Sequence, residues 1–192
     1  MSVRRSAVPF LCRRARLPSP VHPADASFPI GELAVSAGLI GLAHAPGTRP
    51  GGQGVGCLAS DLDRIAEWGA TIVVTLTEAA ELHLLGIAAI AREVGRRHMG
   101  WQLWPIRDYQ VPDAAFDTAW PGRSADLRAA LAQGGRVLIH CRGGLGRTGM
   151  ISARLLVDGG IAGAAAIAAV RAIRPAAIET AAQEQWVVKA VK

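Results

Sequence analysis

The sequence predicts an α/β fold with a predominantly parallel central sheet of four to five strands and helices on both faces. Short apolar runs rich in β-branched residues alternate along the chain with longer segments of helical periodicity. Parallel strands need long crossover connections, which are usually helices, so this alternation favours parallel pairing. Of the 192 residues, 51% are hydrophobic and only 19% are charged, which is typical of a folded protein rather than a disordered one.

The first strand candidate is an apolar run over residues 33–42. A segment rich in glycine and proline, residues 45–52, ends it. Ser60 is expected to cap a helix over residues 61–68, because acidic residues in the first turn suit the helix dipole.

The next strand candidate, residues 71–76, is rich in β-branched side chains. A helical pattern follows over residues 78–97, with a predicted break near Gly86. Residues 101–106 form a further strand candidate. This order again places a helix between two strands, as a parallel sheet requires.

The second half of the chain contains a buried strand candidate at residues 136–139, preceded by a helix over 125–132 that two glycines close. Three further helices are expected, near residues 148–158, 162–173 and 180–190. Because functional groups of such sheets gather where the strands end, we expect the site after the strands 101–106 and 136–139.

Residues 140–149, His-Cys-Arg-Gly-Gly-Leu-Gly-Arg-Thr-Gly, form the loop between that buried strand and the helix after it. Three glycines in so short a loop let successive backbone N–H groups turn inward, and the helix N-terminus adds unpaired donors and a partial positive charge. The segment therefore predicts an anion-binding loop that fits a tetrahedral dianion such as phosphate.

Cys141 and Arg147 stand at the two ends of this loop. The inward N–H groups and the arginine favour the charged thiolate of Cys141, which makes its sulfur a nucleophile at neutral pH. Arg147 offers a planar fork for two phosphate oxygens, and Thr148 can hydrogen-bond the sulfur when it leaves as thiolate. His140 is expected to be structural, because its side chain should point away from that of Cys141. The alternative is an inert buried cysteine in a glycine-rich turn.

The segment 140–149 resembles the phosphate-binding loop of the cysteine-dependent dual-specificity protein phosphatases, His-Cys-x5-Arg-Ser/Thr-Gly. Within that family it is most similar to the branch around the cyclin-dependent-kinase-associated phosphatase, whose loop also carries Gly-Gly-Leu-Gly-Arg. Trp-Pro-Ile-Arg-Asp at 104–108, followed by Val-Pro-Asp at 111–113, is similar to the general-acid loop of that branch. Arg-Pro-Ala-Ala-Ile-Glu-Thr at 174–180, with Gln183, is similar to the segment before its last helix. The resemblance spans residues 31–192, and Ala176 departs from it because the family usually has glycine there.

The resemblance implies a protein tyrosine phosphatase-like fold and hydrolysis of phosphate monoesters through a phosphocysteine intermediate. Asp108 would be the general acid that protonates the leaving oxygen and later takes a proton from the attacking water, with Asp113 in reserve. Gln183 would orient that water, or is an exposed helix glutamine. The residues implied to bind the phosphate, besides Gln183, are Arg142, Gly143, Gly144, Leu145, Gly146 and Arg147. No cofactor is implied, and because the histidines and cysteines lack metal-ligand spacing, no metal is expected.

The substrate class follows from what surrounds the loop. Nothing in the sequence resembles the aromatic recognition loop of tyrosine-specific relatives, so a shallow pocket that admits phosphotyrosine, phosphoserine and phosphothreonine of proteins is expected. Phosphoinositide and other small-molecule phosphatases are the alternative, although inositol-lipid relatives tend to carry lysines in the loop and here only Arg142 adds charge. Two hypotheses assign the chain to other functional classes. One is a phosphate-binding module that has lost turnover, and the other is a rhodanese-like sulfur transferase.

Charge is concentrated at the amino terminus. The first 20 residues contain five arginines and no acidic residue, so the 21 basic residues of the chain leave 16 for the rest, against 15 acidic ones. We therefore expect a basic, proline-rich, mobile tail over residues 1–27 and a single domain over 28–192. Because the rest of the chain is nearly neutral, no nucleic-acid partner is expected.

The longest uncharged run, residues 33–48, is shorter than the roughly 18 residues that span a bilayer. No membrane span is therefore expected. The three cysteines form no disulfide framework, which favours the cytoplasm.

Overall fold

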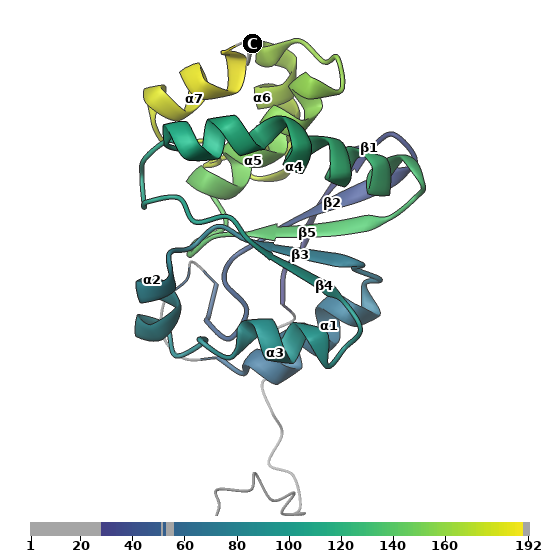
Figure 1. The fold of residues 1–192 in the computed structure, drawn as a ribbon, viewed down its shortest axis with the longest axis vertical. Helices are drawn as coiled ribbons and strands as arrows, with labels where there is room; N and C mark the ends of the chain where they lie inside the picture. Colours follow the sequence, from purple (N-terminus) through teal and green to yellow (C-terminus); the bar gives the residue numbers. More distant parts are fainter. Residues whose placement is uncertain (1–27, 51, 53–55, 190–192) are drawn as a thin grey trace, which may run out of the picture.

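A five-stranded sheet forms the centre of the computed structural model, which describes residues 28–50, 52 and 56–189 (Figure 1). The strand order is β1-β2-β5-β3-β4, and only β1 and β2 pair antiparallel. The predicted fold class is confirmed, whereas the basic tail predicted for residues 1–27 lies outside the described residues. The strands are β1 (Gly31–Val35), β2 (Gly38–Ala43), β3 (Ile72–Thr75), β4 (Gly100–Leu103) and β5 (Arg136–His140).

Helices cover both faces of the sheet (Figure 1). One layer contains the helices of the first half of the chain, α1 (Leu58–Glu67), α2 (Ala79–Leu84) and α3 (Ile90–Gly95). The other contains α4 (Ala114–Ala132), α5 (Gly146–Asp158), α6 (Gly163–Ile173) and α7 (Ala181–Val188). None of the helices in the described part of the chain is long and apolar enough to cross a membrane.

The middle residues of the central strands β3 and β5 are apolar because both faces of these strands are buried. In β5, Val137 and Ile139 pack in the core under α4 to α7, whereas Leu138 packs in the core under α1 to α3. In β3, Val74 packs in the core under α4 to α7, and Val73 packs in the core under α1 to α3. Side chains alternate between the faces of a strand, so a strand covered on both sides becomes a continuous apolar run.

The prediction of one strand over residues 33–42 is wrong, because this segment is the hairpin of β1 and β2. Val35 pairs with Gly38, and Ser36 takes the left-handed conformation with φ +55°. Two-residue hairpin turns need positive φ, usually supplied by glycine or asparagine. Ser36 takes the place of such a residue, so the sequence did not indicate the turn.

The prediction of a helix over residues 125–132 is too short, because α4 begins at Ala114 and contains Pro121. Phe116 and Trp120 of its first half stack with ring centroids 5.9 Å apart, and both pack against Trp104 and Trp186. Proline disfavours the interior of a helix, and this buried aromatic packing stabilises α4 despite Pro121.

Two further predictions concern where helices begin and break. The capping role expected of Ser60 is wrong, because α1 already begins at Leu58 and its N-cap residue, Cys57, makes no side-chain capping bond. The break predicted near Gly86 is confirmed, since Gly86 takes φ +71° between α2 and α3.

Asp113 caps α4 through a hydrogen bond from the Phe116 N–H to its Oδ1, 2.8 Å long. Asp113→Ala should therefore lower the free energy of unfolding by about 1 kcal/mol in urea titrations. Asp113→Ser keeps a capping oxygen and should recover most of the loss. Equal losses in the two variants would contradict the capping role.

Candidate active site

The loop between β5 and α5 wraps around the sulfur of Cys141. This side chain is only 3% exposed, and its Sγ accepts a hydrogen bond from the Gly144 N–H at 3.2 Å. Gly144 has φ +72°, and a Cβ added there would lie 2.4 Å from the carbonyl group of Ala43 in β2. Only glycine fits both the backbone conformation and this close approach.

His140, at the end of β5, contacts both the backbone of the loop and the neighbouring strand β3. Its Nδ1 lies 3.3 Å from the carbonyl oxygen of Cys141 and its Nε2 lies 2.8 Å from Oγ1 of Thr75, which also accepts from the indole of Trp101. A carbonyl only accepts, so Nδ1 carries the proton and Nε2 accepts from Thr75. Burial lowers the pKa of His140 to about 4, which keeps the ring neutral. This arrangement suits a structural residue.

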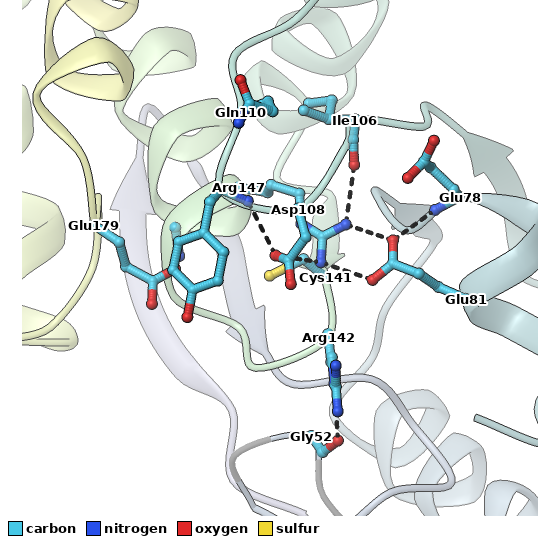
Figure 2. Close-up of polar contacts among 12 residues, drawn as sticks. Gly52, Glu78, Glu81, Ile106, Asp108, Gln110, Cys141, Arg142, Arg147 and Glu179 are labelled. Carbon is cyan, nitrogen blue, oxygen red and sulfur yellow. Dashed lines mark hydrogen bonds and ion pairs between the residues drawn. The ribbon is translucent and has the colours of Figure 1, made fainter. Parts of the chain in front are cut away.

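Arg147, in the first turn of α5, is only 1% exposed and is held on three sides (Figure 2). Its guanidinium donates to both oxygens of Glu81, at 2.6 and 3.0 Å, and to the carbonyl oxygen of Ile106 at 2.9 Å. Its Nη2 also lies 2.9 Å from Oδ1 of Asp108. Burial alone would lower the pKa of Arg147, but the bond to Glu81 and the charges around the group, Cys141 among them, raise it.

Glu81 is a functional residue that the sequence reasoning missed. It lies in the first turn of α2, where its Oε2 also accepts from the Glu78 N–H at 2.9 Å in a capping box (Figure 2). Burial raises the pKa of Glu81, but the bonds from Arg147 and Glu78 and the charge of Arg147 outweigh burial and lower it. The Glu-x-x-Glu spacing signals a helix start, but nothing in it points to an arginine 66 positions away.

Asp108 lies on the loop that leaves β4 and reaches the anion-binding loop. The Trp104 N–H and the Ile106 N–H bond to carbonyl oxygens of residues 75 and 76, so this loop first follows the end of β3. Asp108 is 42% exposed and its Oδ1 also accepts from the Tyr109 N–H. The structure thus brings Asp108 beside Arg147, whereas the reserve candidate Asp113 is engaged as the cap of α4.

Glu179 and Gln183, before and within α7, lie against the start of α5. Oε2 of Glu179 accepts from the Gly146 N–H at 2.9 Å, a contact that the sequence reasoning missed. Gln183 is fully buried, and its Oε1 accepts from the Glu179 N–H at 2.9 Å. The alternative that Gln183 is an exposed helix glutamine is therefore wrong. A Cβ on Gly146 would lie 2.3 Å from Oε2 of Glu179 and 3.1 Å from either amide atom of Gln183, so a side chain there would displace these two groups.

A polar cavity of about 320 Å³ opens over these groups. Arg142 stands at its edge with Nε 3.5 Å from the carbonyl oxygen of Gly52 (Figure 2). Thr148, in the first turn of α5, is fully buried, and its Oγ1 has no hydrogen bond to any residue that the structure describes. The lining residues are Asp108, Tyr109, Cys141, Arg142, Gly143, Leu145 and Glu179.

No group of three or more histidine, cysteine, aspartate or glutamate side chains that could hold a metal ion occurs within residues 28–50, 52 and 56–189. The charges around the cavity are instead balanced between arginines and carboxylates, as in the contact of Arg147 with Glu81 and Asp108.

Comparison with solved structures shows the same fold in several phosphatases. The chain is similar to kinase associated phosphatase carrying a cysteine-to-serine substitution at its catalytic site, with a TM-score of 0.73 and 22% identity over 89% of this chain and 94% of that one. It is similar to Tk-PTP in the active form, with a TM-score of 0.62 and 26% identity over 77% of this chain and 88% of that one. It is also similar to PTPMT1 in complex with PI(5)P, with a TM-score of 0.63 and 17% identity over 82% of this chain and 92% of that one.

Sequence comparison assigns the family. No curated protein matches the chain. The sequence model of the PTP-SAK family, described as the DSP-PTPase phosphatase domain of Swiss Army Knife proteins, matches residues 55–187, which is well over half of the chain. The chain therefore belongs to this family and is a phosphatase domain of the dual-specificity and tyrosine phosphatase type.

Proposed function

We propose that the chain hydrolyses phosphate monoesters on proteins, at phosphotyrosine and at phosphoserine or phosphothreonine, through a phosphocysteine intermediate on Cys141. The observation that carries this proposal is the position of Asp108, which comes from the loop after β4, lines the same cavity as Cys141 and lies 2.9 Å from Nη2 of Arg147. A nucleophile, a fixed cation and a carboxyl group at one anion site are the parts that phosphoryl transfer needs.

In the first step, the thiolate Sγ of Cys141 attacks phosphorus, an S–P bond forms and the P–O bond to the leaving group breaks. Arg147 and the inward N–H groups of residues 142–146 hold the other phosphate oxygens. Asp108 donates its proton to the leaving oxygen, because an alkoxide leaves poorly. The contact between Asp108 and Nη2 of Arg147 supports this role, since a phosphate held by Arg147 competes for that donor and frees the carboxyl group beside the leaving oxygen.

In the second step, a water attacks phosphorus, the S–P bond breaks and Cys141 leaves as a thiolate. Asp108 takes the proton of this water. The Gly144 N–H, which already donates to Sγ, stabilises the departing thiolate together with the hydroxyl of Thr148. We assign Gln183 to orient the water, because its amide is buried against Gly146 of the loop that carries the phosphate.

Phosphoinositide hydrolysis is the second candidate, because PTPMT1 in complex with PI(5)P shares the fold. Arg142 is the one basic residue besides Arg147 in the loop, and two carboxylates, Asp108 and Glu179, line the cavity. Such a balance suits a single phosphate better than a ring with several, so we favour protein substrates. The free cysteines Cys57 and Cys141 support a reducing compartment, the cytoplasm.

Turnover is expected without a metal, because the proposed charge stabilisation comes from Arg147 and backbone donors. The protein should hydrolyse p-nitrophenyl phosphate in excess EDTA, and vanadate should block the reaction. Cys141→Ser should lower kcat by a factor of about 10³ or more, whereas Cys57→Ser should keep the wild-type rate. Full loss of activity on chelation, or an active Cys141→Ser variant, would refute the mechanism. A protein that binds phosphate without turnover would be a binding module.

The acid role of Asp108 predicts a dependence on the leaving group. Asp108→Ala should lower kcat by about 10²–10⁴ for alkyl phosphates and less for activated aryl esters, whose leaving groups need no proton. Asp113→Ala is the matched control and should lose stability but not this rate. The reverse pattern would assign the proton transfer to Asp113.

Glu81 is a positioning residue, because it fixes the guanidinium of Arg147 without lining the cavity. Glu81→Gln keeps the size of the side chain but removes one of the two charged partners of a buried arginine. It should lower kcat/KM for p-nitrophenyl phosphate by about 10- to 100-fold, mainly through KM. Glu78→Gln, at the start of the same helix, should have little effect. Wild-type KM in Glu81→Gln would mean that Ile106 and Asp108 suffice to hold Arg147.

A further inference from the structure

A second cavity, of about 490 Å³, lies next to the phosphate cavity and shares Leu145 with it. Leu145 belongs to the anion-binding loop itself, and its side chain is half-buried between the two spaces. The walls of the second cavity come from the segment that enters β1, from the end of α6 and from the turn after it. They include Pro29, Ile30, Ile173, Pro175 and Ala176.

The second cavity is apolar apart from one arginine, Arg174, whose buried Nε has no hydrogen-bond partner among the described residues. The Nη2 of Arg174 donates to the carbonyl oxygens of Leu42, at 2.9 Å, and Pro29, at 3.2 Å. These bonds tie the turn after α6 to the edge of the sheet. The remaining wall residues carry aliphatic or proline side chains, so the space suits an apolar group.

Two wall residues have no evident role in the fold alone. Ile173 is 38% exposed, which makes it one of few large apolar side chains on the described surface. Ala176 is also exposed, and its methyl group adds apolar surface to this wall. Exposed apolar surface that continues from a cavity is typical of a recognition site.

We propose that this cavity is a substrate subsite that takes an apolar side chain next to the phosphorylated residue of a protein. The inference rests on the proposed function and narrows its substrates to phosphorylated residues with an apolar neighbour. Consecutive Cα atoms are 3.8 Å apart, so an extended peptide moves roughly 7 Å in two residues. Since Leu145 lines both cavities, we expect a residue one or two positions from the phosphorylated one to reach the second cavity.

The experiment compares phosphotyrosine peptides that have one leucine, at position −2, −1, +1 or +2, with a parent peptide of serines and glycines. Hydrolysis of p-nitrophenyl phosphate by the wild-type protein tests the proposed function separately, because that substrate does not reach the second cavity. For one of the leucine positions we expect a kcat/KM about tenfold above that of the parent, as partial burial of a leucine provides.

Substitutions then locate the effect. Ile173→Asn, which adds no charge, should remove the leucine preference, and Ile173→Val should retain it. Ile161→Asn is the matched control, because Ile161 is also exposed, at 46%, but lines a different cavity with Ala34 and Gly159. This variant should keep the preference.

Three outcomes would overturn the inference. The first two would leave the proposed function intact, and the third would favour its phosphoinositide alternative. Equal kcat/KM for all five peptides would exclude an apolar subsite. An equal loss on p-nitrophenyl phosphate and on the leucine peptide in Ile173→Asn would show a general effect on the site. A preference for phosphatidylinositol phosphate vesicles over every peptide, lost in Ile173→Asn, would assign the cavity to a lipid chain.

Discussion

The buried ion pair between Arg147 and Glu81 is the interaction on which the site depends. Arg147 begins α5 in one helical layer, and Glu81 begins α2 in the other, so the pair bridges the two layers across the ends of the strands (Figures 1 and 2). Burying a guanidinium is unfavourable unless its donors are satisfied. Here Glu81, the carbonyl of Ile106 and Asp108 pair with the two terminal nitrogens and fix the direction of the guanidinium, whereas its buried Nε has no hydrogen-bond partner among the described residues.

Close contacts constrain the backbone of the anion-binding loop, as ion pairs constrain the side chain of Arg147. Gly144 has to pass within contact distance of β2, and Gly146 has to pass beside Gln183. The hairpin of β1 and β2 and the helix α7 therefore shape the loop from opposite sides, although neither contributes the reactive sulfur. The neutral ring of His140 connects the loop to Thr75 at the end of β3, and Thr75 in turn accepts from the indole of Trp101.

Carboxylates already occupy two of the donors that an anion would use. Asp108 contacts Nη2 of Arg147, and Glu179 accepts from the Gly146 N–H. These contacts offset the positive charge of the loop. In the mechanism that we propose, phosphate replaces at least the first of them, so the acid and the substrate compete for one cation and phosphate binding is coupled to the position of Asp108.

The sequence by itself determined the fold class and the core of the site. Alternating apolar runs and helices indicate a parallel sheet, and Cys141, the glycines and Arg147 form one contiguous segment whose spacing is fixed by covalent geometry. Only the tertiary structure decided that Asp108 rather than Asp113 lies beside Arg147, that Glu81 holds this arginine, and that Leu145 adjoins a second, apolar cavity. It also decided that α4 continues through Pro121. These features depend on packing and charge pairing between residues far apart in the chain, and local spacing and propensity carry no information about such contacts.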